Sequence, residues 1–474
     1  MPFSFTLPTT SCFAFSQFFS SDTHPSLPLA ASTSRGVLRD TLKKHKRLPP
    51  AERASHLSSV LLSLENYIPY LTVIDRGLGS QLLDGKPVDV ILKSTPIFKW
   101  RPTLSDNPVL GREIARIEVN SLEYEIYFTL STLAYTHTLL SRSCLNPLYS
   151  LSTALPSLEQ RTLAITTATK NLLLAGSIHE YLSTCCEQLS DPVPCIDLSQ
   201  STFKALSNLA LAEATLLAVL KDDPYPALLV QDRNKLDKEW MIKSPEIPKV
   251  RANLFARLCL AAAGHTTNGL SLLNNVSSKG EGNISPHLLK YMEGLRKTSR
   301  GKACRFFAIG AELDGQIGMA LAWLQAGMYE LGIRLGDDSM KSLKKVKKGW
   351  EEKKEQKRIE KGTHWGTDAG SLEEERILDF LESKWSKIND TINAQNVPPI
   401  GPLMATMPSG RDIYSLKQFD PPSLDASVLL NLKSLEYDDS FGMENSSDEE
   451  DKRKARNEAS PHIQSDYSGR GNYY

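Results

Sequence analysis

The sequence lacks the residue patterns that mark disulfide frameworks and metal sites. Its seven cysteines form no CxxC pair, and its nine histidines form no HExxH or HxH arrangement. An odd number of cysteines without framework spacing predicts reduced thiols, as is usual in the cytosol. Cys185, Cys186 and Cys195 lie near His179 in the chain but without zinc-finger spacing, so we expect no bound metal.

The chain also has no excess charge of either sign, with 55 basic and 55 acidic side chains. Net charge therefore gives no indication of a nucleic-acid partner, and any electrostatic contact must be local. The first residues are apolar but lack a basic region, and Pro8 interrupts them, so no secretory signal is expected. No stretch reaches the roughly 18 uncharged apolar residues of a membrane span, which predicts peripheral membrane contact at most.

Sequence motifs of catalysis are missing as well. Gly301-Lys302 is not preceded by the glycine that a Walker loop needs, and no GxSxG is present. No acidic pair falls in a strand-to-helix turn that would aim it into a cleft. We therefore predict that the protein is not an enzyme and has neither a catalytic residue nor a cofactor.

What the sequence does contain is a series of long helical segments. Helical signals begin at Pro50, and apolar residues over 57–71 recur with i, i+3, i+4, i+7 spacing. Candidate strands are confined to 1–10 and 86–101. Further helices are expected at about 114–142, 158–186, 200–221, 248–275, 285–334, 337–361 and 372–393. Long helices with short connectors predict an all-α array, either a bundle or a solenoid.

The composition changes after Pro398. Residues 398–422 resemble a loop but are not very polar, which predicts a segment that wraps back over the folded body. A short amphipathic helix is expected within 423–436, whereas 438–474 has few aliphatic residues and blocks of both charges, as is typical of disorder. We predict one domain over residues 1–422, and then a short helix and a disordered tail over 423–474.

Five motifs in chain order resemble the Bro-one domain of the ALIX-type family. They are an aromatic-x-Trp signature with a leucine-aromatic-glutamate helix, a small-Gly helix, a leucine-alanine helix, a Gly-containing Ile-Leu-Ala helix and a closing Val-Pro. In this sequence they occupy 98–100 with 122–135, 175–182, 206–214, 317–326 and 392–398. The chain departs from the pattern at Ile178, where an aromatic is usual, and at Asn393, where a tyrosine is usual. It also lacks the glutamines of the leucine-alanine helix.

The resemblance implies a curved, solenoid-like all-α domain with tetratricopeptide-like helix hairpins and a minor N-terminal β element. It also implies an adaptor that binds the C-terminal helix of the ESCRT-III core filament subunit. In the family, a few apolar residues of the corresponding helices stay exposed as a docking patch. Leu216, Leu254 and Leu258 occupy those places here. The alternative is that these leucines belong to the core.

Residues 1–11 and 24–50, together with the single-domain length, resemble most closely the fungal family members that act in alkaline-pH signalling. This implies a cytoplasmic adaptor recruited to endosomal or plasma-membrane ESCRT sites, with components of the pH-signalling complex among its partners. At such a site a calpain-like protease would process a PacC-type zinc-finger transcription factor. The alternative within the same fold is a general role in endosomal cargo sorting.

The segment 341–361 carries ten Lys or Arg against four Glu. Its Lys344, Lys345, Lys347 and Lys348 are candidates for contact with an acidic membrane surface, which would make the protein a peripheral membrane-binding module. A solvated helical face with i, i+4 ion pairs explains the same composition.

Overall fold

The structure is a computed structural model that describes residues 2–83, 86–106, 113–149, 156–187, 193–226, 247–278, 283–333, 353–354, 357–358 and 365–433. The chain divides into a first unit, Met1–Ser434, and a second unit, Leu435–Tyr474. The predicted disordered tail lies outside the described residues. The first unit extends past the predicted domain boundary at residue 422.

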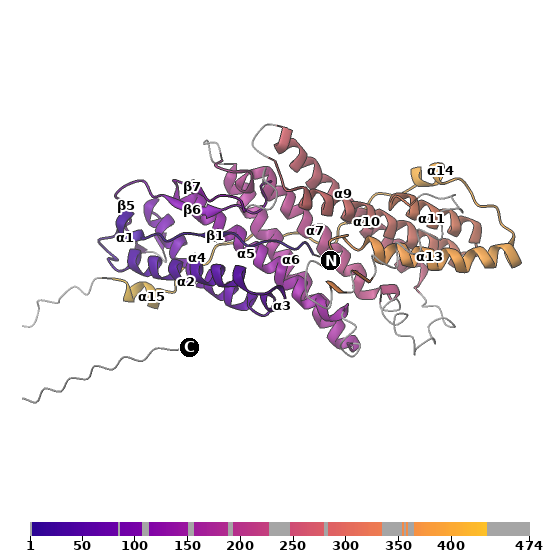
Figure 1. The fold of residues 1–474 in the computed structure, drawn as a ribbon, viewed down its shortest axis with the longest axis horizontal. Coiled ribbons are helices and arrows are strands. Elements are labelled where there is room, and N and C mark those ends of the chain that lie inside the picture. Colours follow the sequence, from indigo (N-terminus) through magenta and orange to yellow (C-terminus); the bar gives the residue numbers. More distant parts are fainter. Residues whose placement is uncertain are drawn as a thin grey trace, which may run out of the picture. The chain divides into compact units, whose positions relative to one another are not determined.

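The N-terminal part of the first unit combines two long helices with short strands (Figure 1). Helix α2 (Leu27–Arg47) packs against α4 (Leu57–Leu78), and the short α1 (Phe15–Phe18) and α3 (Pro50–Arg53) lie beside them in the chain. An antiparallel sheet has the order β1-β6-β7, built from Thr9–Thr10, Phe98–Arg101 and Ile117–Val119. Two smaller antiparallel pairs are β2 (Phe19–Ser20) with β5 (Ile91–Leu92), and β3 (Leu82–Leu83) with β4 (Lys86–Pro87).

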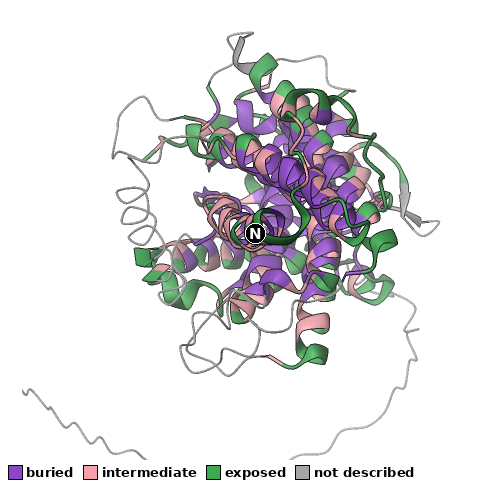
Figure 2. Ribbon diagram, turned by 90° about the vertical axis from the view of Figure 1, so that its right-hand side faces the viewer, coloured by how far each residue is buried: buried purple, intermediate pink, exposed green. Residues whose placement is uncertain are grey.

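The rest of the first unit is a helical array in which successive long helices pack on one another. Its long helices are α5 (Leu122–Leu145), α6 (Leu158–Cys186), α7 (Gln200–Asp222), α9 (Lys249–Ser278), α10 (Pro286–Leu313), α11 (Ile317–Glu330) and α13 (Ser371–Ile388). Shorter turns and helices are η1 (Asn146–Leu148), η2 (Ile196–Leu198), η5 (Asn389–Asn393), α14 (Ile400–Ala405) and α15 (Ala426–Asn431). Buried residues gather between the helices (Figure 2). This arrangement confirms the predicted solenoid-like all-α fold with a minor β element.

Local chemistry explains where several helices begin and end. Ser157, with Gln160, forms a capping box at the start of α6, and Ser199 caps α7 by accepting a hydrogen bond from the amide of Thr202. The predicted helix over 285–334 is divided in two by a turn at Gly315, whose φ of +72° suits glycine. The resulting α10–α11 pair is a helix hairpin of the predicted kind.

Two sequence predictions of secondary structure were wrong, and one cannot be compared. The first long helix begins at Leu27 rather than at Pro50, because Ala31, Leu38 and Leu42 form a buried stripe despite the many Ser and Thr residues nearby. Residues 117–119 form β7 rather than helix, since Ser121 caps α5 only afterwards. The predicted helix 337–361 lies almost wholly outside the described residues.

A buried carboxylate joins the two parts of the most N-terminal motif. Glu125 of α5 accepts hydrogen bonds from Arg35 Nε at 2.8 Å, Tyr67 Oη at 2.9 Å and Trp100 Nε1 at 2.5 Å. Trp100 also stacks on Phe128, with ring centroids 5.2 Å apart. The aromatic-x-Trp signature and the leucine-aromatic-glutamate helix are therefore in direct contact, and they fix β6 against α2, α4 and α5.

Helices α4 and α7 are long and apolar enough, by length and composition alone, to cross a membrane. This differs from the sequence prediction that no such segment exists. In the apolar window of each helix, 56% and 67% of the residues are buried inside the first unit. That is the pattern of helices in the core of a folded domain.

Candidate protein-docking site

The three leucines predicted to form the docking patch lie on two neighbouring helices, α7 and α9. Leu216 of α7 is half-buried, contacts two of the hydrophobic core clusters and lines a small cavity of about 50 Å³. Leu254 of α9 is also half-buried. Leu258 is only 4% exposed and belongs to the cluster that α9 shares with α10, α11 and α13. The structure thus places Leu258 in the core, which is the alternative that the sequence left open.

The exposed apolar part of α9 lies one turn before Leu254. Val250 is 82% exposed, and it precedes Leu254 by four residues, so the two side chains lie on one face of the helix. Val250 was not among the predicted docking residues, although its i, i+4 spacing from Leu254 was a usable signal. Lys249 and Arg251 flank this end of α9, and they pair with Asp314 at 2.6 Å and Asp222 at 3.9 Å.

The same face of α9 is covered further along by the C-terminal segment of the first unit. Positions 257, 261 and 265 continue the stripe at helical spacing. Arg257 O accepts from Arg411 N at 3.0 Å, and Arg257 Nε donates to Ser409 O at 3.2 Å. His265 Nε2 lies 2.8 Å from Asp412 Oδ1. Residues 409–412, which we call the strap, therefore cover the stripe between Arg257 and His265, beyond its Val250–Leu254 end.

The strap can lie this close to α9 because residue 410 is glycine. A Cβ at Gly410 would lie 2.5 Å from the backbone nitrogen of Ala261. We expect Gly410→Ala to displace the strap and lower the free energy of unfolding by about 1–3 kcal/mol, as overpacking does. Urea denaturation measures the loss. Gly401→Ala is the matched control, since nothing lies within 4 Å of its new Cβ. Equal stability of the two variants would contradict the close contact.

A buried ion cluster holds the helices around the docking site in place. Arg305 of α10 donates to Asp223, which follows α7, at 2.6 Å and to Glu374 of α13 at 2.6 Å. Lys302 Nζ lies 2.8 Å from Glu374. Burial works against the charge of Arg305, but Asp223 and Glu374 outweigh it and raise its pKa. Likewise, burial opposes ionisation of Glu374, yet Arg305 and Lys302 lower its pKa.

The remaining candidate residues do not add chemistry to this site. All seven cysteines are free thiols, and burial raises the pKa of both Cys186 and Cys259 to about 12. Within the described residues no group of three or more His, Cys, Asp or Glu is placed to hold a metal ion. The candidate membrane-binding residues Lys344, Lys345, Lys347 and Lys348 lie outside the described part of the chain.

Comparison with known proteins gives a full-length relative. The chain is 40% identical over 470 residues to the pH-response regulator protein palC of Emericella nidulans, covering 91% of this chain and 92% of that protein. No family model matches the sequence.

Two solved structures share the fold. ALIX, in complex with the SIVmac239 PYKEVTEDL late domain, aligns with a TM-score of 0.54 and 15% identity. That alignment covers 89% of this chain and 49% of the ALIX chain, so the chain spans about half the length of ALIX. A Bro1 domain, described as a structural basis for endosomal targeting, aligns with a TM-score of 0.50 and 18% identity over 91% of this chain and 95% of that one.

Proposed function

Since the chain belongs to the family of the pH-response regulator palC, we propose that it is a non-enzymatic adaptor of alkaline-pH signalling that binds an ESCRT-III core filament subunit. Family membership supports the signalling role. The motifs shared with ALIX-type domains support the choice of partner. The observation that carries the proposal is the exposed apolar end of α9, at Val250 and Leu254.

The geometry of this end of α9 suits an amphipathic helix from the partner. Two apolar side chains at i and i+4 form a short stripe on α9. Such a stripe can contact the apolar face of an amphipathic helix. Isolated exposed apolar residues are common on protein surfaces. This stripe supports docking because it lies on α9, whose counterpart carries part of the docking patch in the family. Lys249 and Arg251 at its rim already pair with Asp314 and Asp222, so the apolar contacts carry the docking.

The strap gives the docked helix a defined end. A partner lying on Val250 and Leu254 meets residues 409–412 of this chain at Arg257, less than one turn beyond Leu254. It either stops there or displaces the strap. Buried Leu258 supports the floor of the stripe rather than touching the partner, so a charge placed there would test folding instead of docking.

The cellular role follows from the proposed partner. An adaptor that binds ESCRT-III would act in the cytoplasm at endosomal or plasma-membrane sites, and would bring a PacC-type transcription factor to its processing protease. The description of a fold neighbour as an endosomal-targeting domain is consistent with this location. General endosomal cargo sorting is the alternative role for the same docking surface.

The docking proposal predicts a loss of binding without a loss of folding. The double variant Val250→Asp/Leu254→Asp should keep its helicity, because Val250 is exposed and Leu254 is half-buried. Its affinity for the purified ESCRT-III core subunit should fall at least about thirtyfold, since loss of a hot-spot contact costs about 2 kcal/mol or more. Isothermal titration calorimetry measures the affinity, and circular dichroism checks the fold.

Leu163→Asp provides the matched control, because Leu163 is an exposed leucine of α6, away from α9. It should bind like the unmodified protein. Wild-type affinity in the folded double variant would overturn the proposed site. In cells, the double variant should block processing of the transcription factor at alkaline pH and leave cargo sorting intact. Defective cargo sorting with normal processing would instead favour the general role.

A further inference from the structure

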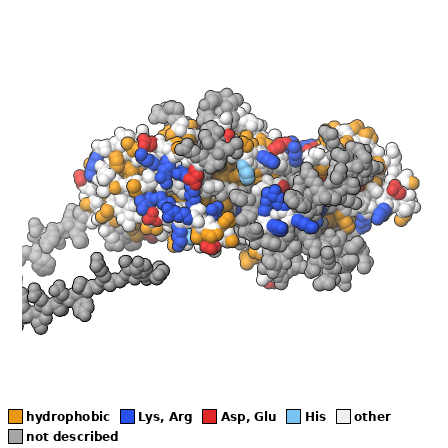
Figure 3. Space-filling model, viewed as in Figure 1, with side chains coloured by type: hydrophobic (Ala, Val, Ile, Leu, Met, Phe, Trp, Pro, Cys, Tyr) orange, Lys and Arg blue, Asp and Glu red, His pale blue; other side chains and the backbone are white. Residues whose placement is uncertain are grey.

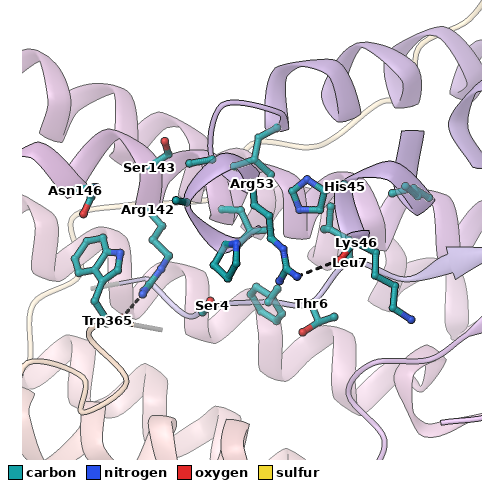
Figure 4. Close-up of a pocket in the computed structure, with 17 residues that line it drawn as sticks. Ser4, Thr6, Leu7, His45, Lys46, Arg53, Arg142, Ser143, Asn146 and Trp365 are labelled. Carbon is teal, nitrogen blue, oxygen red and sulfur yellow. Dashed lines mark hydrogen bonds between the residues drawn. The ribbon is translucent and has the colours of Figure 1, made fainter. Parts of the chain in front are cut away.

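A cavity of about 190 Å³ lies at the N-terminal end of the helical array, away from the α9 stripe. Residues 4–7 run along one side of it, and the C-terminal ends of α2 and α5 form two of its walls. Helix α3 and the start of α4 form another wall, and Trp365 closes the end (Figure 4). Five separate parts of the chain thus build the cavity, and all of its lining residues are described.

The charged residues that line the cavity all carry the same sign. Lys46, Arg53 and Arg142 line it beside His45, which burial keeps neutral near pH 7 by lowering its pKa to about 4, and no Asp or Glu is among its described lining residues. The whole chain has equal numbers of basic and acidic residues, so this one-sided lining does not follow from composition. A concave surface lined by cations concentrates anions, because its low-dielectric walls focus the field.

Two polar atoms of the lining have no hydrogen-bond partner among the described residues. They are Nδ1 of His45, whose residue is only 7% exposed, and Oδ1 of Asn146. A buried polar group without a partner costs about 1–3 kcal/mol, so such groups are normally satisfied. A ligand with hydrogen-bonding oxygens in the cavity would supply a partner for His45, and a hydroxyl on that ligand would supply one for Asn146.

The two arginines are held in position by backbone carbonyls. Arg53 Nε donates to Leu48 O at 3.0 Å, and its Nη2 donates to Lys46 O at 3.1 Å. Arg142 Nη1 donates to Pro2 O at 2.8 Å, its Nη2 donates to Trp365 O, and the guanidinium lies 4.4 Å from the centroid of the Trp365 ring. Because neutral carbonyls hold the Arg53 guanidinium, its positive charge is fixed in place without being cancelled by them.

The rest of the lining is apolar or carries hydroxyl groups. Phe5, Leu42, Leu57, Leu139 and the Trp365 ring provide the apolar part, and Ser4, Thr6 and Ser143 provide hydroxyls. An inorganic ion alone would leave the apolar walls without contacts. A mostly apolar pocket with a few convergent polar groups is the usual form of a site for an organic ligand.

The surface around the cavity is basic as well. The last turn of α2 carries Lys44, Lys46 and Arg47. Burial, followed by the charges of Arg101 and Arg116, lowers the pKa of Lys46. Lys and Arg side chains also gather over the strands and α2 on the face drawn in Figure 3. Lys46 pairs with Glu113 at 2.5 Å, so the attraction of an anion towards the cavity rests on Arg53, Arg142 and the other basic residues of this end of the first unit.

We propose that this cavity is a binding site for a phosphate ester with an apolar portion. The phosphate would lie between Arg53 and His45, because guanidinium groups bind phosphate oxygens through paired N–H donors and the buried Nδ1 of His45 needs a partner. The apolar portion would pack between Leu139 and Trp365. The same phosphate chemistry is available from a soluble phosphate ester and from a phosphoinositide headgroup at a membrane.

Calorimetric titration of the full chain tests the proposal with phenyl phosphate, inorganic phosphate and benzyl alcohol as probes. Phenyl phosphate should bind saturably with one site, inorganic phosphate more weakly, and the neutral alcohol not measurably. Arg53→Met and His45→Phe should each weaken phenyl phosphate at least about tenfold. His45→Phe should keep or raise the thermal midpoint, because it removes an unsatisfied buried group, so a binding loss cannot be attributed to unfolding.

Lys44→Met is the control, since Lys44 is an exposed cation of the same helix and does not line the cavity. A second arm measures sedimentation with phosphatidylcholine vesicles with and without phosphatidylinositol 4-phosphate. Phosphoinositide-dependent sedimentation that phenyl phosphate competes away, and that Arg53→Met abolishes, identifies a lipid headgroup as the source. Saturable phenyl phosphate binding without vesicle binding identifies a soluble ester. No saturable binding in either arm, or equal losses in Lys44→Met and Arg53→Met, overturns the proposal.

Discussion

Replacing Arg305 by methionine is expected to lower the free energy of unfolding by about 3–5 kcal/mol, because removing one partner of a buried ion cluster leaves the others uncompensated. Arg305 is fully buried, as is Glu374, and Asp223 is nearly so. Methionine matches the aliphatic part of the arginine side chain but removes the guanidinium group that pairs with Asp223. Of the two cations in the cluster, Lys302 alone would remain beside Glu374.

Urea denaturation at neutral pH measures this loss. Arg296→Met serves as the control, because Arg296 forms an i, i+3 pair with Glu293 on the surface of the same helix. Such exposed pairs contribute about 0.2–1 kcal/mol. Adding Glu374→Leu to Arg305→Met should recover part of the loss, since it removes one of the stranded charges. If Arg305→Met costs no more than Arg296→Met, the cluster does not stabilise the fold.

The arrangement of the long helices was largely predictable from the sequence. The limits of α6, α7 and α9 fall within a few residues of the apolar periodicity, because long amphipathic helices between short connectors carry a strong local signal. The motifs added a long-range contact. Trp100 and Glu125, which belong to the two separated parts of the first motif, do meet in the core. Local periodicity alone could not have paired them.

Helix α2 was missed for a physical reason. Its 21 residues include several Ser and Thr and one Gly, which have a low helix propensity. Burial of Leu38 and Leu42 against α4 stabilises the helix. Tertiary packing of this kind cannot be predicted from the sequence of the helix alone.

The docking site and the phosphate cavity show a second limit of sequence analysis. Leu254 and Leu258 are equivalent in sequence, one helical turn apart, yet one is half-buried and the other fully packed between helices. Helical periodicity gives the face of a residue but not what covers that face. The cavity depends on residues as distant in the sequence as Ser4 and Trp365, and no local pattern predicts that both line it.

Glu213 gives the second large effect, through pH. This carboxyl group lies on α7 and is 4% exposed, with Oε1 accepting hydrogen bonds from Phe3 N at 2.8 Å and Tyr291 Oη at 2.7 Å. Burial raises its pKa from 4.5 to about 7, although the hydrogen bonds from Tyr291 and Phe3 and the nearby positive charges work against the shift. The folded protein therefore binds this proton more tightly than the unfolded chain does.

A raised carboxyl pKa stabilises the fold at low pH and loses that contribution as pH rises. The contribution of Glu213 is fully present below pH 4.5 and disappears as the pH passes through about 7. A difference of this size corresponds to about 3 kcal/mol. A glutamine side chain in its place would keep the acceptor oxygen for both hydrogen bonds but could not ionise.

Glu213→Gln should therefore match the unmodified protein at about pH 4.5 and exceed its free energy of unfolding by up to about 3 kcal/mol at about pH 8. Urea denaturation across this range measures both proteins. Buried His45 and His179, whose pKa values burial lowers to about 4 and about 3, give stability that is lost as pH falls. Their contribution is the same in both proteins and cancels in the difference. A difference that stays constant with pH would show that Glu213 is ionised in the folded protein throughout this range, and that its neighbours compensate fully for its burial.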